Sequence, residues 1–337
     1  MIYPDFLKQG DTIGVTAPSD GNKKEIDFKR LAFAAEHLRE KGFLIKETPN
    51  VRTSVKGRSS SKEDRAEQLM DLVTDPSVRA VISAKGGDYL MEVLSLLDYK
   101  VLRENPKWMQ GYSDNTGLLF TVTTLCDIAT LYTNHYNDFA MEPWHPSVEN
   151  NMAFLQGDLR KQQSFDKFED GFYDKETGKE GYTLTGKVCW INARGEEEIT
   201  VSGRLLGGCL DVLLNLVGTR FDAVEKFVQR YEKDGILWFL ESFDLNSEEL
   251  ARGLWQLKEA GWFAHCKGFV FGRPCMFESF TDTTYREAML SVLDELEVPM
   301  ILDTDIGHKG PQFCVMNGAL GTFHSKDGKG SLVTELG

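Results

Sequence analysis

The sequence predicts an α/β protein with two domains, the first built on a doubly wound parallel sheet. From Asp11 to about Thr133, short apolar runs alternate with helix-like segments, which is the pattern of parallel strands joined by crossover helices. The 337 residues exceed one average domain and suffice for two. Hydrophobic residues make up 41% and charged residues 27%, as in globular proteins, so a disordered, fibrous or membrane class does not fit.

The first domain, residues 1–140, contains five predicted strands and four predicted helices. The strands are the apolar runs Thr12–Ala17, Phe43–Glu47, Ala80–Ala84, Trp108–Gly111 and Ala129–Tyr132. The helices are expected over Lys24–Lys41, from Ser60 onward, after Gly86-Gly87 and after Ser113. At the second helix, Glu63 stands three residues after Ser60, which predicts a capping box.

Residues 141–185 form a predicted linker or excursion, because this segment is rich in Pro, Asn, Asp, Lys and Gly. Residues 186–337 form the predicted second domain, which is mixed α/β and less regular. Its expected elements are β-like pieces at Lys187–Asn192 and Glu198–Val201, a turn at Gly207-Gly208, strands at Ile236–Leu240, Gly268–Phe271 and Met300–Leu302, and an amphipathic helix at Ser247–Ala260.

Composition argues against several partners and compartments. Lys and Arg total 38 against 52 Asp and Glu, a net charge of −14 that repels phosphate backbones and anionic lipid, so we expect neither a nucleic acid nor a membrane partner. The N-terminus lacks a signal-peptide pattern, and Asp127 interrupts the most apolar stretch, Thr116–Thr133, so we expect a cytoplasmic protein. Six scattered cysteines and the absence of nucleotide-binding motifs predict reduced thiols and neither metal nor cofactor.

Ser113 stands where a predicted strand meets a predicted helix. Ligands of doubly wound sheets bind beyond the carboxyl ends of the strands. Gly111 precedes Ser113 by two residues, as in a nucleophile elbow, whereas Asn115 replaces the second glycine of the G-x-S-x-G motif. The alternative is that Ser113 or Asp114 simply caps the helix.

A second strand-to-helix junction carries the adjacent glycines Gly86 and Gly87. Without side chains, their backbone N–H groups can approach a ligand oxygen closely, which suits an oxyanion hole or a phosphate cradle. A tight turn explains the pair equally well.

A nucleophilic serine needs a base and an acid that orients the base. His308 directly follows a predicted strand in a loop framed by glycines and proline, and His135 is a second candidate base in a similar position. Glu241 ends the apolar run Ile236–Leu240, where an unpaired carboxylate is costly to bury, so it is the candidate acid. The alternative for Glu241 is a cap on the following loop.

Ser113, Glu241 and His308 thus occur in the order Ser, Glu, His, each at a strand end. With the segments Gly14–Ser19, Gly203–Gly208 and Gly268–Arg273 and the Gly86-Gly87 turn, the chain resembles the LD-carboxypeptidase family of serine peptidases over roughly residues 5 to 325. That family includes murein tetrapeptide carboxypeptidases and microcin C self-immunity proteins.

The resemblance implies a role for each of these residues. Ser113 would be the nucleophile, Glu241 the acid and His308 the base, and the N–H groups of Gly87 and Asp114 would form the oxyanion hole. It also implies a flavodoxin-like N-terminal domain, a C-terminal domain with a small β-barrel-like sheet, and a homodimer.

The substrate contacts are less defined. Gly86 and Asp88 belong to the Gly-Gly turn, which here continues as Asp88-Tyr89-Leu90 where many family members have Asn or Ser. Trp190 is expected near the mouth of the site, either stacking on substrate or serving as a hydrophobic anchor. An exopeptidase must also bind a terminal carboxylate, for which the candidate cations are Lys85, Arg204, Arg273 and Lys309.

The function that this pattern predicts is hydrolysis of an amide bond near a free carboxyl terminus, as in an L,D-peptide of murein. One alternative is a microcin C-like hydrolase of peptidyl or aminoacyl nucleotides that confers self-immunity. A second, from another class, is a non-catalytic two-lobed protein that binds a small molecule.

Overall fold

The computed structural model describes residues 1–337 and divides them into two compact units. The first unit consists of Met1–Arg160, Phe172–Tyr182 and Phe313–Met316. The second consists of Lys161–Gly171, Thr183–Gln312 and Asn317–Gly337. The segment 141–185, expected as a linker, therefore contributes residues to both units.

The first unit contains a six-stranded sheet in the order β14-β5-β4-β3-β1-β2. Its strands are β1 (Thr12–Thr16), β2 (Leu44–Glu47), β3 (Val78–Ser83), β4 (Trp108–Gly111), β5 (Thr130–Tyr132) and β14 (Val315–Asn317). The pairs β1-β2, β1-β3, β3-β4 and β4-β5 are parallel. The order 2-1-3-4-5 is the flavodoxin-like one, so the predicted doubly wound sheet is confirmed, and the chain reverses its direction across the sheet between β1 and β3.

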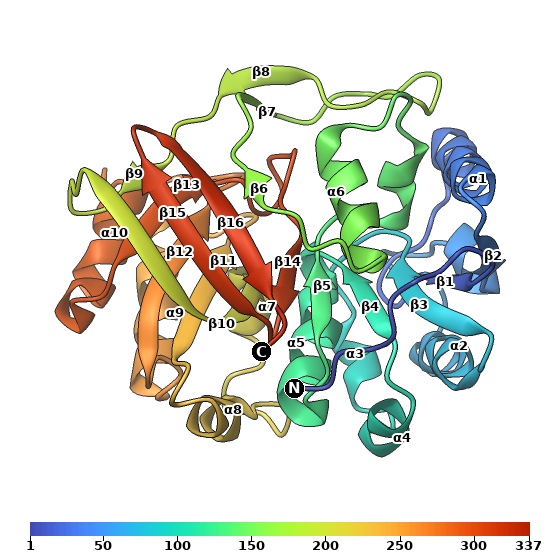
Figure 1. Ribbon diagram of the computed structural model, residues 1–337, viewed down its shortest axis with the longest axis horizontal. Helices are drawn as coiled ribbons and strands as arrows, with labels where there is room; N and C mark the ends of the chain where they lie inside the picture. Colours follow the sequence, from blue (N-terminus) through green and yellow to red (C-terminus); the bar gives the residue numbers. More distant parts are fainter. The chain divides into compact units, whose positions relative to one another are not determined.

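Helices cover both faces of this sheet, which is why β1, β3, β4 and β5 are buried apolar runs, whereas the edge strand β2 is partly exposed (Figure 1). They are α1 (Glu25–Glu40), α2 (Lys62–Thr74), α3 (Met91–Leu94), α4 (Tyr99–Glu104), α5 (Thr116–Cys126) and α6 (Pro146–Leu155), with short 3₁₀ turns η1 (Pro49–Arg52), η2 (Ser113–Asn115) and η3 (Tyr136–Ala140). The predicted start of α2 is wrong by one residue. Ser61 is the N-cap and accepts a hydrogen bond from the Asp64 N–H at 3.1 Å, so Ser60 and Glu63 form no capping box.

The second unit contains an eight-stranded mixed sheet in the order β6-β16-β15-β10-β11-β12-β13-β9, larger than the small barrel-like sheet expected. Its strands are β6 (Gln162–Gln163), β9 (Ile191–Asn192), β10 (Glu198–Cys209), β11 (Ile236–Glu241), β12 (Cys266–Gly272), β13 (Met300–Thr304), β15 (Leu320–Lys326) and β16 (Lys329–Glu335). Strands β10 to β13 are parallel, and the flanking pairs are antiparallel. A separate two-stranded antiparallel ribbon pairs β7 (Lys167–Glu169) with β8 (Leu184–Lys187). The helices of this unit are α7 (Leu210–Leu213), α8 (Val224–Arg230), α9 (Ser247–Glu259) and α10 (Tyr285–Leu293), followed by the 3₁₀ turn η4 (Asp294–Leu296).

The turn predicted at Gly207-Gly208 is wrong, because both residues lie within strand β10. A Cβ atom on Gly207 would come within 1.7 Å of the Phe239 carbonyl oxygen on β11. The glycine therefore permits close approach of two strands, which local sequence cannot distinguish from a turn.

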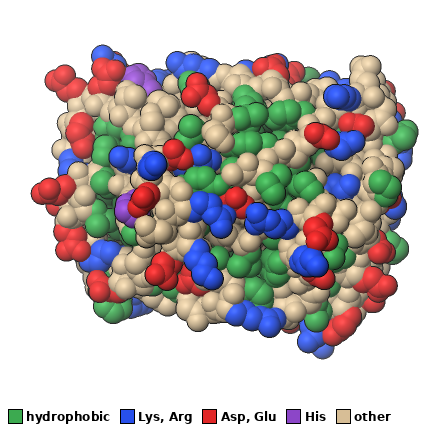
Figure 2. Space-filling view, turned by 60° about the horizontal axis from the view of Figure 1, so that its bottom comes forward, with side chains coloured by type: hydrophobic (Ala, Val, Ile, Leu, Met, Phe, Trp, Pro, Cys, Tyr) green, Lys and Arg blue, Asp and Glu red, His purple; other side chains and the backbone are tan.

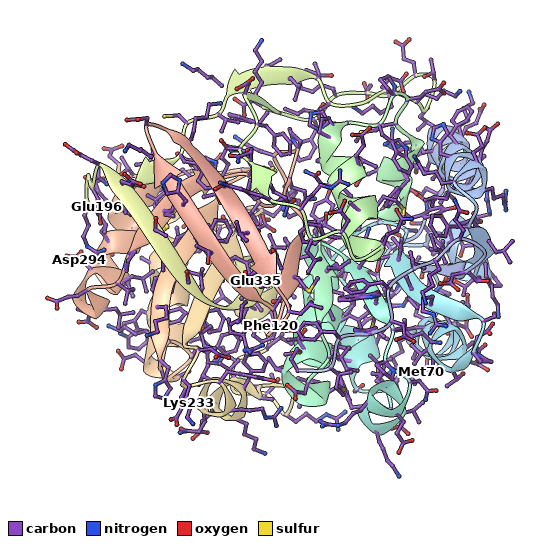
Figure 3. All side chains as sticks on the ribbon, in the orientation of Figure 1. Met70, Phe120, Glu196, Lys233, Asp294 and Glu335 are labelled. Atoms are coloured by element: carbon purple, nitrogen blue, oxygen red, sulfur yellow. The ribbon has the colours of Figure 1, made fainter.

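Each unit has its own apolar core. In the first unit, α5 is buried along nearly its whole length, including Phe120, which is labelled in Figure 3. In the second, Trp238 on β11 packs on Trp262 with ring centroids 5.9 Å apart. Figure 2 shows acidic, basic and apolar side chains intermingled on one face. Among the helices, none is both long and apolar enough to cross a membrane.

Candidate active site

Ser113 lies in a strained turn directly after strand β4. Its φ of +61° is in the left-handed region, which costs a non-glycine residue about 1–2 kcal/mol. The Ser113 N–H donates to the Tyr132 hydroxyl at 3.3 Å. The N-cap residues of η2 and α5 are Tyr112 and Asn115, so Ser113 occupies neither cap position and the cap alternative loses its support. A strained serine between a strand and a helix is the geometry of a nucleophile elbow.

Asn115 explains why the second glycine of the elbow motif is absent. Its side chain is fully buried against Gly111, where an added Cβ would lie 3.0 Å from the Asn115 Cβ. Its amide donates to the carbonyl oxygens of Lys85 at 3.1 Å and Tyr112 at 3.2 Å. The amide therefore links the elbow to the loop that follows β3.

His135 is held by the same network. Its imidazole stacks on Tyr112 at 4.1 Å, and its Nε2 faces two donors, the Tyr112 N–H at 3.3 Å and the Asn115 amide at 3.0 Å. Nε2 also lies 3.1 Å from the Tyr112 carbonyl oxygen, so its role as donor or acceptor depends on the tautomer of the ring. The stacked Tyr112 ring and these three polar contacts hold His135 against the elbow.

The loop after β3 brings Gly86 directly against Ser113. A Cβ on Gly86 would lie 3.0 Å from the Ser113 Cβ and 3.1 Å from its Oγ. Gly87 has a φ of +157°, and a Cβ there would lie 2.3 Å from the Ser19 Oγ. Gly87 therefore needs glycine for this approach, and a side chain at Gly86 would press on Ser113, so the loop is more than a tight turn.

Asp114 is almost completely buried and ties three segments together. Its Oδ2 accepts a hydrogen bond from the Ser19 hydroxyl after β1 and another from the Leu90 N–H at 2.8 Å. Burial raises the pKa of the Asp114 carboxyl, and the hydrogen bonds from Ser19 and Leu90 oppose that rise.

In the second unit, His308 and Glu241 form a buried hydrogen-bonded pair. His308 Nδ1 lies 2.8 Å from Glu241 Oε2, and Glu241 is fully buried at the end of β11. Gly307 has a φ of +96°, and a Cβ there would lie 2.5 Å from Glu241 Oε2, so only glycine lets the histidine loop approach the carboxylate. The predicted acid is therefore paired with the predicted base, and the capping alternative for Glu241 is not needed.

The net effect of its surroundings is to raise the pKa of His308. Burial is the largest influence and lowers the pKa, but the negative charge and hydrogen bond of Glu241, with further charge from Asp211 and Asp244, outweigh it. The Phe243 ring packs on the imidazole with centroids 4.7 Å apart.

Asp211 at the start of α7 is a site residue that the sequence analysis missed. Its carboxylate accepts the N–H groups of Phe243 and Asp244, both at 3.0 Å, and so holds the turn that packs on His308. A hydrogen bond to Asp211, aided by burial, raises the pKa of Asp244 to about 6. No short-range sequence signal connects Asp211 with a turn 32 residues later.

The remaining candidate residues lie in different environments. Asp88 is exposed, and Lys85 is partly exposed with its Nζ 3.0 Å from Asp20. Lys309, also partly exposed, is 2.8 Å from Asp170. Arg204 is buried, with its Nη2 2.6 Å from Asp234, and it pairs with the first residue of β11, at the opposite end of that strand from Glu241.

Trp190 and Arg273 converge on one buried carboxylate. The Trp190 Nε1–H donates to Asp305 Oδ2 at 3.0 Å, and the Arg273 Nη2 lies 2.7 Å from Asp305 Oδ1. Trp190 is 3% exposed and packs beside Gly330, where an added Cβ would lie 2.0 Å from its ring. Of the two alternatives for Trp190, this burial favours the hydrophobic anchor over stacking on substrate.

Comparison with known proteins identifies the family of this chain. Residues 13–133 match the family model described as the LD-carboxypeptidase N-terminal domain, and residues 202–323 match the LD-carboxypeptidase C-terminal domain. A Bacillus subtilis protein named a probable murein peptide carboxypeptidase is 27% identical over 327 residues, covering 94% of this chain and 89% of the relative. The microcin C7 self-immunity protein MccF of Escherichia coli is 25% identical, covering 90% and 88%.

Two solved structures share the fold along the whole chain. An MccF-like protein from Bacillus anthracis superposes with a TM-score of 0.80 at 25% identity, covering 99% of this chain and 100% of the other. MccF in complex with aspartyl sulfamoyl adenosine superposes with a TM-score of 0.81 at 22% identity, covering 100% of both chains. The two family models together match more than half of the sequence, and the chain therefore belongs to the LD-carboxypeptidase family of serine peptidases.

Proposed function

We propose that this carboxypeptidase cleaves an L,D-amide bond next to the free carboxyl terminus of a murein peptide, with Ser113, His308 and Glu241 as its catalytic triad. The observation that carries the proposal is the buried hydrogen bond between Glu241 and His308. A buried carboxylate that holds a histidine in one tautomer is the arrangement that activates the nucleophile of serine hydrolases. The Bacillus subtilis relative named a probable murein peptide carboxypeptidase supports this substrate class.

The hydrogen bond determines which nitrogen acts as the base. Glu241 is a carboxylate and can only accept, so Nδ1 of His308 carries a proton, and in the neutral imidazole Nε2 is the unprotonated nitrogen. In the proposed first step, Nε2 takes the Ser113 hydroxyl proton while Oγ attacks the amide carbon. His308 then returns that proton to the leaving amine, which leaves an acyl-enzyme, and the same base activates water to release the product.

The oxyanion that forms on the carbonyl oxygen would accept hydrogen bonds from the N–H groups of Gly87 and Asp114. Gly86 lies against Ser113, and Gly87 has a backbone conformation that residues with side chains rarely adopt, which supports a loop shaped for close approach to substrate. Losing one such donor costs about 3–4 kcal/mol of transition-state stabilisation in comparable sites. The loop therefore contributes to the rate as much as the base does.

We infer that the cation for the substrate carboxylate is Lys85 or Lys309. Both ammonium groups are partly exposed, and each has a single carboxylate neighbour that a substrate can displace. Arg273 is buried with the fully buried Asp305, so freeing it would leave a buried charge unpaired, and Arg204 is buried beside the partly exposed Asp234. Gly86 and Asp88 would line the same end of the substrate.

The microcin C-like alternative rests on a specific resemblance. MccF has been solved with aspartyl sulfamoyl adenosine, and this chain matches MccF over its whole length. We propose this substrate class as the second candidate. We also propose a cytoplasmic location, as expected in the sequence analysis, and a homodimer, from the family resemblance.

The decisive experiment compares two substrates and one probe on the purified protein. Mass spectrometry should show loss of the terminal D-residue from an L,D-tetrapeptide, while hydrolysis of an aminoacyl sulfamoyl adenosine instead would favour the alternative. A fluorophosphonate should label Ser113, because an activated serine attacks it. A protein that hydrolyses neither substrate and takes no label is a binding protein, and the proposal would be wrong.

A further inference from the structure

We propose that the side chains of Asp114 and Asn115 are positioning residues that clamp the Gly86-Gly87 loop against Ser113. The two residues directly follow the proposed nucleophile, and each reaches back to one end of that loop. The inference rests on the proposed function, because the loop matters only if Gly87 serves the oxyanion.

The loop needs an external support. Residues 85–89 lie in neither a helix nor a strand, so the regular hydrogen bonds of the sheet end at Ala84, whose N–H donates to the Thr16 carbonyl. Inside the loop, the Gly86 carbonyl accepts from the Asp20 N–H at 3.3 Å. Two consecutive glycines also have the greatest backbone freedom of any pair.

The clamp consists of one hydrogen bond on each side of the glycines. Before them, the Lys85 carbonyl accepts from the Asn115 amide at 3.1 Å. After them, the Leu90 N–H donates to the Asp114 carboxylate at 2.8 Å. Both anchoring side chains are buried, Asn115 completely and Asp114 to 6% exposure, so water competes poorly for these bonds.

Each anchor is itself held in place. The Asp114 carboxylate also accepts from the Ser19 hydroxyl, which ties it to the loop after β1. The Asn115 amide is oriented by His135 Nε2 at 3.0 Å and by the Tyr112 carbonyl. The clamp therefore spans the three loops that follow β1, β3 and β4, at the edge of the sheet where the flavodoxin-like order changes direction.

The geometry leaves little tolerance for movement. Gly86 is already so close to Ser113 that a single added carbon would lie 3.0 Å from the serine Cβ. A displacement of about 1 Å between catalytic groups can cost about 10²-fold in rate. Asn115 therefore has a reason to replace the glycine of the elbow motif, since glycine has no side-chain amide with which to hold the loop.

The test compares Asp114→Ala and Asn115→Ala with the conservative Asp114→Asn on an L,D-tetrapeptide. Each alanine variant should lose about 10²-fold in kcat with KM changed less than about threefold. Asp114→Asn should recover to within about tenfold of wild type, because its amide oxygen, placed where Oδ2 lies, can still accept from both the Leu90 N–H and the Ser19 hydroxyl. Asp98→Ala is the matched control, since Asp98 accepts two N–H groups at the start of α4 and should affect stability without affecting kcat.

A transition-state probe separates positioning from a purely structural role. Inhibition by a peptide boronate, whose adduct places an oxygen in the oxyanion hole, should weaken in parallel with kcat/KM, while inhibition by the cleaved product should not change. Unchanged kcat and boronate affinity in both alanine variants would overturn the clamp. If an alanine variant does not fold, Ser19→Ala can replace it, because it removes only one of the two donors to Asp114. Ser19→Ala should lower kcat by less than the Asp114 and Asn115 variants do. An unchanged kcat in Ser19→Ala would also count against the clamp. Activity and labelling of the wild type test the proposed function separately.

Discussion

Nδ1 of His308 donates a hydrogen bond to the buried carboxylate of Glu241 across 2.8 Å. The bond joins the loop after β13 to the end of β11, and Gly307 permits it because any side chain at that position would collide with the carboxylate. It fixes the tautomer of the imidazole and leaves Nε2 as the only nitrogen able to take a proton from a nucleophile.

Glu241→Gln should separate the orienting role of Glu241 from a structural one. The amide oxygen can still accept from Nδ1, so we expect the thermal midpoint to change by only a few degrees. The negative charge that stabilises the imidazolium is lost and the wrong tautomer becomes accessible, so kcat should fall by about 10²–10⁴-fold. Calorimetry and steady-state kinetics measure the two effects, and a variant with normal kcat or one that unfolds would assign Glu241 to the fold alone.

Ser113→Ala should abolish turnover without harming the fold. We expect kcat to fall by several orders of magnitude and fluorophosphonate labelling to disappear. Adding His308→Ala should make the loss no worse, because triad members act as a unit. Retention of more than a tenth of wild-type kcat, a loss below about 1.4 kcal/mol, would contradict the assignment.

Ser113→Gly provides a second test, based on backbone strain. Glycine adopts the φ of +61° at position 113 without the steric cost that serine bears. This relief opposes the entropic cost of glycine in the unfolded chain. The inactive glycine variant should therefore be at least as stable to urea as Ser113→Ala, and a clearly less stable one would mean that residue 113 is not strained.

The pH dependence of kcat/KM should follow His308. The imidazole must be neutral to act as a base, so activity should rise with pH through a midpoint above 6.5, the direction in which Glu241, Asp211 and Asp244 shift its pKa. The raised pKa of His308 also stabilises the folded protein, and this contribution is fully present below about pH 6.5 and is lost as pH rises through the raised pKa.

Asp211→Asn should move that kinetic midpoint to lower pH, because it removes a negative charge near His308. The variant also removes the partner that raises the pKa of Asp244 to about 6, so Asp244 stays charged to lower pH. This retained negative charge near His308 partly offsets the downward shift of the kinetic midpoint. Glu198→Gln removes one charge at the far end of β10 and serves as the control. Identical pH profiles for wild type and Asp211→Asn would exclude an electrostatic role for Asp211.

Lys85 and Arg273 should respond differently to substitution. Lys85→Ala should raise KM for a tetrapeptide with a free carboxylate, have little effect on KM for the corresponding C-terminal amide, and leave stability unchanged. Lys309→Ala, measured with the same two substrates, tests the second candidate.

Arg273→Met should instead lower the free energy of unfolding by about 3–5 kcal/mol, because it leaves the buried Asp305 carboxylate without its cation. Urea denaturation measures this loss, and a stable variant with raised KM would restore Arg273 as a substrate contact.

Periodicity and composition were sufficient to predict five of the six strands of the first sheet, whereas β14 was not predicted. The inner strands β1, β3, β4 and β5 are buried apolar runs because helices cover both of their faces, and such runs are visible in a single sequence. The two junction residues Ser113 and Glu241 were detectable for a related reason, because a hydroxyl or carboxylate at the end of an apolar run contrasts with its neighbours. Their catalytic roles stay predictions.

Tertiary structure decided the features that depend on residues far apart in the chain. Gly207 was predicted in a turn because local sequence contains no record of the Phe239 carbonyl that lies against it. Asp211, Asn115 and Trp190 acquire their roles from partners such as Phe243, Lys85 and Asp305, which the fold brings together. Apolar patterning is repeated along an element and so can be recognised locally, whereas a hydrogen bond between two loops needs only one residue on each, and only the folded chain shows which two residues meet.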